Sequence, residues 1–351
     1  MDTEIRISRL VHARSLKWFN RFMTFGDDDA MKVRFSPGTT FSFDCKIHST
    51  ALAWNPKTQT GVFKLVHASG VTIIMKHVPM KTQDQVKKIA MEVRCLRVFV
   101  EFMKHAVSCH FVLPMGTFEV TGIAMNQLQT HHTVSSQFHK VILAEAADGS
   151  LFQLIRNRGL DPYELKVILF QVLYTLHVIC FYYPNFRHHD LHLANVLYLT
   201  QPRPLKTNLY HCVGHTFYHN LGRCPYRMLL WDMYFGTVIP NHESKSYGDV
   251  HKFVDSLLFT LSLTGTKTKP SIDCMEFLTT VVPEHLRLRT DPKTLVDRQL
   301  YNQQQYINSL EYITIESLLT HEYFRELRLL PRLCTTHDSF SIKTHLRDYL
   351  I

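Results

Sequence analysis

The chain has 351 residues, 45% of them hydrophobic and 20% charged, which is an ordinary composition for a folded protein with one large domain or two lobes. A formal net charge of +9 favours encounters with phosphates or acidic surfaces, but the lysines and arginines are scattered, so nucleic-acid contact is allowed without being supported. Charged residues recur through residues 1–22 and eight cysteines are dispersed along the chain. These features argue against a secretory signal there and favour reduced thiols in an intracellular protein, cytoplasmic or nuclear.

The first half of the chain is predicted to be rich in strands. A basic amphipathic helix over 6–24 is broken by the GDDDA run at 26–30. Strands are then predicted at 32–35, 61–66, 71–76, 109–113 and 141–146. A helix is predicted at 82–106, between the third and fourth of these strands. The residues at 67–70 are typical of a hairpin turn between two of these strands.

The second half is predicted to be mainly helical and opens with a helix at 161–183. Asp161 at the N-cap, Pro162 at the first helical position and Glu164 at N3 form a capping box, which satisfies backbone donors at the helix start. The apolar run at 165–183 is nearly long enough to span a membrane, but polar residues interrupt it. It is therefore predicted to be a buried core helix without membrane contact.

A polar loop follows this helix, in the run FRHHDLHLANVLYL at 186–199. Asp190 and Asn195 lie just ahead of a strand-like stretch, and Asp232 follows a second apolar run at 228–231. Phosphoryl transfer needs a cation on the nucleotide phosphates, oxygen ligands for Mg²⁺, and a carboxylate that orients the attacking hydroxyl. Asp190 can take the last of these roles, while Asn195 and Asp232 offer the oxygen ligands.

The run HHDLHLANVL at 188–197 resembles the catalytic loop of the protein-kinase family, H-R-D-L-x-x-x-N, with histidines where arginine and lysine are commonest. In order and approximate spacing the resemblance covers residues 55–265. It implies an α+β, bilobal protein-kinase-like fold, with a small β-rich N-lobe that has one main helix and a larger, mainly α-helical C-lobe. The N-terminal helix and N-lobe are expected at 1–146, and the C-lobe at 147–351, with an insert near 200–227.

The same resemblance implies which residues bind ATP and Mg²⁺. Lys76 looks like the strand lysine that pairs with the phosphates, and Glu92 like the helix glutamate that braces it, with Glu101 as the alternative on the same helix. The run VILAEAADGSL at 141–151 looks like the last N-lobe strand running into the hinge. Asp190 and Lys76 are then catalytic, and Asn195 and Asp232 are the metal ligands. The implied nucleotide-binding set is Lys76, Glu92, Gly61, Glu145, Ala147, Asn195 and Asp232.

Several positions depart from the family pattern. Gly61 stands alone in the expected phosphate loop and could equally be a turn glycine, and the D-F-G position reads D-M-Y at 232–234. His189 replaces the arginine that commonly answers an activation-loop phosphate, and Asp249 follows too soon after Asp232 for an ordinary activation segment. Activity without phosphorylation of that segment is therefore expected. D-L-H in the loop, the long insert and the missing A-P-E segment are similar to haspin-like kinases and related kinases of large DNA viruses.

Several residues near Asp190 and Asp232 are expected to have structural roles. His188 is expected to hold the loop against the backbone next to Asp232, and Asp249, in the YGDV run that opens a helix, to accept backbone hydrogen bonds beneath the loop. His192 either contacts the phosphate or acceptor or packs locally. The insert at 211–224 carries histidines and cysteines, but their spacing fits no common zinc pattern, so a surface hairpin is favoured over a metal site.

The leading interpretation is an ATP-dependent serine/threonine protein kinase that transfers the γ-phosphoryl group to a hydroxyl of a protein substrate, in the host cell if the chain is viral. The loop also resembles that of aminoglycoside and choline kinases, which keeps a small-molecule phosphotransferase as an alternative. The poor glycine loop suggests a third class, a pseudokinase scaffold. Retention of Lys76 and of the predicted metal ligands argues against that scaffold, because a scaffold has no need of Mg²⁺ geometry.

Overall fold

The computed structural model describes residues 33–34, 47–55, 60–67, 72–121, 138–201, 206–233, 236–238, 247–288, 306–307, 310, 312–329 and 336–346. The chain divides into two compact units. The first takes in the chain up to Lys104 together with Val112–Ala146, and the second takes in His105–Phe111 and the chain from Ala147 onward. The helix expected at 6–24 and the turn residues 68–70 lie outside the described residues.

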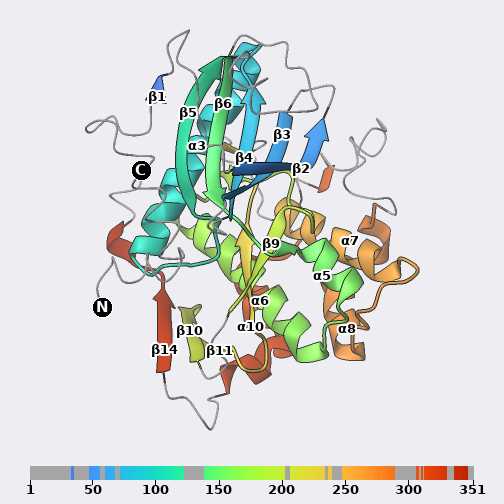
Figure 1. The fold of residues 1–351 in the computed structure, drawn as a ribbon. Coiled ribbons are helices and arrows are strands. Elements are labelled where there is room, and N and C mark those ends of the chain that lie inside the picture. Colours follow the sequence, from blue (N-terminus) through green and yellow to red (C-terminus); the bar gives the residue numbers. More distant parts are fainter. Residues whose placement is uncertain are drawn as a thin grey trace. The chain divides into compact units, whose positions relative to one another are not determined.

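The first unit is built on a six-stranded sheet. Its strand order is β1-β5-β6-β4-β3-β2, with β1 at Val33–Arg34, β2 at Ile47–Asn55, β3 at Thr60–His67, β4 at Thr72–Pro79, β5 at Pro114–Thr121 and β6 at Phe138–Glu145. Helix α3, Gln83–Lys104, packs on this sheet against β4 and β5 (Figure 1). Its buried face includes Ile89, Leu96 and Phe102, as the helical period predicts. The strands predicted at 61–66 and 71–76 and the helix at 82–106 are confirmed.

One strand prediction is wrong. The apolar run at 109–113 forms a buried connection, in which Phe111 makes only an isolated bridge to Leu230, and the strand β5 begins at Pro114. Its backbone groups bond elsewhere: the amide of Leu230 donates to the carbonyl of His110. Apolar residues mark burial in such a short run, and burial alone does not distinguish a strand from an extended link.

The second unit has helices and three small sheets, so it is less purely helical than the sequence suggests. The helices are α5 at Leu151–Asn157, α6 at Pro162–Tyr182, α7 at Tyr247–Ser262, α8 at Ile272–Val281 and α10 at Ile315–Thr320, with 3₁₀ turns η2 at Glu284–Leu286, η4 at Glu322–Arg328 and η5 at Thr344–Leu346. The sheets have the orders β12-β9-β7, β11-β10-β14 and β13-β8. Their strands are β7 at Gly149–Ser150, β8 at Phe186–Arg187, β9 at Val196–Thr200, β10 at Lys206–Cys212, β11 at His215–Asn220, β12 at Tyr226–Leu230, β13 at Thr237–Val238 and β14 at Thr336–Ser341.

Helix α6 is the central helix of the second unit. Its predicted capping box is confirmed, because Asp161 accepts from the amide of Glu164 at 2.8 Å and Glu164 accepts from the amide of Asp161 at 3.1 Å. Among the described helices, α6 is the one long and apolar enough to span a membrane, and 83% of that apolar window is buried inside the fold. It contacts β12 and α10.

The predicted hairpin in the insert is confirmed, and the structure adds a third strand to it. β10 and β11 pair antiparallel around a turn at 213–214, and β14 from the C-terminal region pairs parallel with the other edge of β10. His211 bonds the hydroxyls of Thr216 and Ser339, each at 3.0 Å. Among the residues described, no group of three or more His, Cys, Asp or Glu side chains is arranged to hold a metal ion.

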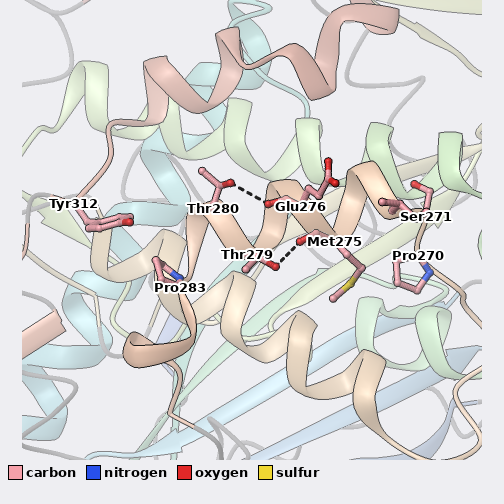
Figure 2. A pocket seen from close by; sticks show the side chains of 9 residues that line it. Pro270, Ser271, Met275, Glu276, Thr279, Thr280, Pro283 and Tyr312 are labelled. Carbon is pink, nitrogen blue, oxygen red and sulfur yellow. Dashed lines mark hydrogen bonds between the residues drawn. The ribbon is translucent and has the colours of Figure 1, made fainter.

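An open pocket of about 710 Å³ runs along α8. Figure 2 shows its lining, which consists of Pro270, Ser271, Ile272, Met275, Glu276, Thr279, Thr280, Pro283 and Tyr312. None of the residues predicted to bind nucleotide or metal lines it. This pocket therefore has no part in the candidate site.

A buried glutamine fixes the strand that leads to Asp232. The Gln171 side chain, on α6, donates to the carbonyl of Tyr226 at 2.9 Å and accepts from the amide of Met228 at 2.8 Å. It thereby pairs the edge of β12 that faces away from β9, as a neighbouring strand would. The sequence between Tyr226 and Asp232 is thus held on both sides.

Replacing Gln171 with leucine should destabilise the protein by about 3 kcal/mol, because two buried backbone groups would lose their partners. Urea unfolding followed by circular dichroism measures the change. Thr175→Val is the matched control, because Thr175 is equally buried on α6 and its hydroxyl bonds only a carbonyl of its own helix. The control should cost less than about 1 kcal/mol. Equal losses in the two variants would contradict this role for Gln171.

Candidate active site

The first unit contains a buried ion pair between Lys76 and Glu92, as the resemblance implies. Lys76 lies on β4, between β3 and β6, and its Nζ donates to the Glu92 carboxylate on α3 at 2.7 and 2.9 Å. Both side chains are almost fully buried, at 2% and 1% exposure. Glu101, the alternative partner, instead pairs with Lys104 at 2.8 Å. A buried lysine held by both oxygens of a carboxylate has a fixed direction, which a phosphate-binding cation needs.

The other predicted nucleotide contacts of this unit lie on strands and on the connection that follows them. Gly61 is a paired residue of β3, opposite Trp54 and His77, so it is not a turn glycine. Of the expected phosphate loop, NPKTQTGVFKLV at 55–66, residues 56–59 lie outside the described residues, and 60–66 belong to β3. Glu145 ends β6, and its carboxylate accepts from the amide of Leu113 at 2.8 Å.

Ala147 is the residue at which the chain returns to the second unit, and the next residue, Asp148, is held by two hydrogen bonds. The Asp148 amide donates to the carbonyl of Tyr198 at 2.9 Å, and the Asp148 carboxylate accepts from the amide of Thr200 at 2.6 Å. Both contacts are made with β9. The C-terminal end of the expected hinge is therefore bonded to β9, the strand that follows the polar loop.

The polar loop at 188–195, called the HHD loop below, is positioned by β9 and β12. These strands are antiparallel, with Val196 opposite Leu230, so Asn195 and Asp232 leave the same end of the pair. The ladder continues one step further, because the Trp231 amide donates to the carbonyl of Asn195 at 3.1 Å. Two residues far apart in sequence are thus brought together by the register of two short strands.

A histidine closes the link between the loop and Asp232. Nε2 of His188 donates to the carbonyl of Trp231 at 3.0 Å, while Nδ1 accepts from the amide of Asp190 at 3.3 Å. Because a carbonyl only accepts, the ring must carry its proton on Nε2. The predicted role of His188, holding the loop against the backbone beside Asp232, is confirmed.

The side chain of Asn195 is oriented by Asp190. Its Nδ2 donates to the backbone carbonyl of Asp190 at 2.9 Å and to the Asp190 carboxylate at 3.3 Å. This fixes the amide so that its oxygen points away from Asp190 and is available as a ligand. An amide oxygen and the Asp232 carboxylate at the end of one strand pair suit Mg²⁺, which takes few protein ligands and completes its shell with water and phosphate oxygens.

Two residues at this place have left-handed backbone. His189 has a φ of 61° and Asp232 has a φ of 63°. Residues other than glycine rarely adopt this conformation, although aspartate and histidine do so more often than most, and such strain is concentrated at functional sites. The surrounding hydrogen bonds must therefore stabilise both turns.

Asp249, near the start of α7, supplies part of that support. Its carboxylate accepts from the amides of His188 and His189, each at 2.9 Å, which confirms the predicted role beneath the loop. Burial lowers the pKa of His189, outweighing the opposing effect of Asp249, with His188, Arg187 and Lys252 lowering it further. A histidine with a lowered pKa is neutral at pH 7.

A lysine that the motif does not contain completes the HHD loop. Nζ of Lys252, one turn after Asp249 on α7, contacts the Asp190 carboxylate at 2.7 Å and donates to the carbonyl of His189 at 3.1 Å. His192 approaches the same carboxylate less closely, with its Nε2 3.7 Å away, and its Nδ1 accepts from the amide of Ala194. Sequence reasoning missed Lys252, because only the path of α7 beneath the loop brings it there.

Gly236, four residues after Asp232, packs closely against its surroundings. The Gly236 amide donates to the carbonyl of Met233 at 2.9 Å. A Cβ there would lie 3.0 Å from that carbonyl and from the Phe186 ring, so any side chain would require these neighbours to shift. The strand β13 follows at once, with Thr237 opposite Arg187 on β8. The chain after Asp232 is thereby tied back to the residues that precede the HHD loop.

Comparison with known proteins supports a kinase-like relationship. No protein-family model matches the chain. The chain is 24% identical over 249 residues to a protein of Acanthamoeba polyphaga mimivirus that is named as a candidate serine/threonine-protein kinase, in a match that covers 57% of this chain. The chain spans about half the length of that relative, 52%. The mixed α and β structure is compatible with a kinase-like fold.

A second carboxylate of α7 makes the stability depend on pH. Burial raises the pKa of Asp255 to about 6, although the backbone of Leu288 and the charge of Arg287 oppose the shift. One of its oxygens has no hydrogen-bond partner among the described residues. Because the folded pKa is raised, the stabilisation from this group is complete below its ordinary value of 3.8 and is lost as the pH rises through 6.

Between pH 5 and 7 the free energy of unfolding of the wild type should therefore fall by about 1 kcal/mol relative to Asp255→Asn, which cannot titrate. Urea unfolding of both proteins across this range tests the expectation. Asp273→Asn is the control: the pKa of Asp273 is lowered by a hydrogen bond from Ser271, so this carboxylate stays ionised throughout. A difference between wild type and Asp255→Asn that stays flat with pH would refute the assignment.

Proposed function

We propose that the chain is an ATP-dependent serine/threonine protein kinase that transfers the γ-phosphoryl group to a hydroxyl of a protein substrate inside the cell. The observation that carries the proposal is the bonded arrangement of Asp190, Asn195 and the backbone beside Asp232 at the end of β9 and β12. The similarity to the mimivirus protein supports the same class. Membership of the haspin-like subgroup is part of this proposal and rests on the sequence motifs alone.

The proposal gives the other predicted site residues the following roles, which for Gly61, Glu145 and Ala147 rest on the sequence resemblance. Lys76, aimed by Glu92, binds nucleotide phosphates, and Gly61, Glu145 and Ala147 contribute the remaining nucleotide contacts from the first unit and the hinge. When bound, ATP supplies the phosphoryl group, and Mg²⁺ neutralises the charge on its phosphates. Asn195 and Asp232 are the residues that would hold the metal ion.

Asp190 has the role of orienting the acceptor. Its carboxylate is 24% exposed and is held by Lys252 and by the amide of Asn195, so it is reachable by a hydroxyl and has a fixed direction. In the transfer, an oxygen of this carboxylate accepts the hydrogen bond of the substrate hydroxyl and takes its proton as the new O–P bond forms.

The site is also proposed to be active without phosphorylation of the segment after Asp232. A phosphate there would need a cation, and His189, at the position where arginine is commonest, has its pKa lowered by burial and is neutral at pH 7. The short segment is instead tied to β8 by β13 and by the close approach of Gly236 to Phe186.

Asp190→Asn should lower the turnover number at least about 100-fold while nucleotide binding is kept, because the amide preserves the shape of the side chain and cannot take a proton. Radiolabelled phosphate transfer to a mixed set of proteins measures turnover, and a thermal shift with ATP and Mg²⁺ measures binding. Asp273→Asn, an exposed carboxylate of α8, is the control and should behave as the wild type.

The same assays separate the alternatives. Transfer to small alcohols but to no protein would indicate a small-molecule phosphotransferase. A thermal shift without any transfer would indicate a scaffold. Undiminished transfer by Asp190→Asn would remove this residue from the mechanism.

Treatment of the purified protein with a phosphatase should leave its phosphotransferase activity within about twofold of the untreated level, because no cation of the HHD loop requires a phosphate partner. Mass spectrometry of residues 233–248 before and after treatment verifies the phosphorylation state. Loss of activity together with loss of a phosphate from this range would contradict the proposal.

A further inference from the structure

Helix α7 presents two opposite charges to the HHD loop. Asp249 accepts from the amides of His188 and His189, and Lys252, one turn later, donates to the carbonyl of His189 and to the carboxylate of Asp190. The Lys252 side chain is only 6% exposed, against 24% for Asp190. The ammonium is therefore buried on the inner side of a carboxylate whose other side reaches solvent.

The loop itself offers no permanent cation to this carboxylate. The position two residues after Asp190, where lysine is common in the resembling family, is His192. Its ring uses Nδ1 to accept from the amide of Ala194, and its Nε2 lies 3.7 Å from Asp190, beyond hydrogen-bond distance. Lys252 approaches a full ångström closer, at 2.7 Å, and carries a whole positive charge.

We infer that Lys252 is the positioning residue for Asp190, supplying from α7 the positive charge that the loop lacks. The ammonium holds one oxygen, Oδ1, of the carboxylate, while the Asn195 amide bonds the other, Oδ2. Two fixed donors leave the carboxylate one orientation in which to accept a substrate hydroxyl. This inference rests on the proposed function, since it assigns a helper to the residue that receives the hydroxyl proton.

Moving the positive charge from Lys252 to position 192 should restore part of the lost turnover. Lys252→Met keeps the length of the buried chain and removes the ammonium, and it should lower the turnover number by roughly 10- to 100-fold, with the Michaelis constant for ATP unchanged within about twofold. Adding His192→Lys to this variant places an ammonium on the other side of Asp190. It should raise turnover at least about threefold above that of Lys252→Met but below the wild-type level, because it cannot replace the bond to the His189 carbonyl.

The control is Lys166→Met. Lys166 on α6 is also mostly buried, at 12% exposure, and its Nζ lies 3.3 Å from the Glu326 carboxylate on η4. The variant therefore removes an ion pair away from the HHD loop. Its turnover should be unchanged. Binding stoichiometry for a fluorescent ATP analogue, measured on every variant, corrects turnover for the fraction of folded sites.

The outcomes separate the two proposals. Full turnover in Lys252→Met, with an active wild type, would overturn the role of Lys252 and leave the kinase assignment intact. A loss of turnover that His192→Lys does not relieve would also overturn it, because the lysine would then act through the backbone of the loop alone. A wild type that transfers no phosphate to any acceptor would refute the proposed function and this inference with it.

Discussion

The geometry of the HHD loop depends on one buried carboxylate. Asp249 accepts two consecutive backbone amides, and this pair of bonds stabilises the left-handed turn at His189 that sends Asp190 back toward Lys252. A charged acceptor on two amides is a strong interaction when solvent is excluded, and neither amide has a neighbouring strand to bond instead. The loop can therefore keep a strained backbone without regular secondary structure around it. Helix α7 serves as the base on which this turn is built.

The second requirement is the register of β9 and β12, which sets Asn195 beside the chain leading to Asp232. Both edges of β12 are satisfied, by β9 and by the side chain of Gln171. The insert also contributes, because His110 bonds the carbonyl of Met228 through Nδ1 and the hydroxyl of Tyr210 on β10 through Nε2. Burial lowers the pKa of His110 to about 3, so this bridge stays neutral and unchanged across the physiological range. The buried ring of His110 thus links the insert to the strand that leads to Asp232.

The HHD loop, the cap of α6, the strands around Lys76 and the helix of Glu92 can be predicted from the sequence, because each has a local signal: a motif, a capping box or a regular apolar period. The preference for Glu92 over Glu101 as the partner of Lys76 is confirmed. Lys252 cannot be predicted in this way, since a lysine on a helix has no pattern that reveals the loop above it. The run at 109–113 was misassigned for a related reason, because buried apolar residues look the same in a strand and in a connection. Non-local contacts, which carry no periodicity, account for what was missed.

The parallel pairing of β14 with β10 affects how the second unit can assemble. Thr336 lies opposite Lys206 and Phe340 opposite Tyr210, so an edge of the insert hairpin remains open until a segment far downstream arrives to cover it. On a ribosome that segment emerges after the helices from α7 to α10 have left the exit tunnel. Until then Tyr210 lacks the stacked ring of Phe340, whose centroid lies 5.3 Å away, and a strand edge with an aromatic face is exposed to other nascent chains. The parallel pairing therefore predicts that this edge closes late in synthesis, and that a chain truncated before β14 would leave the edge of β10 without a partner strand.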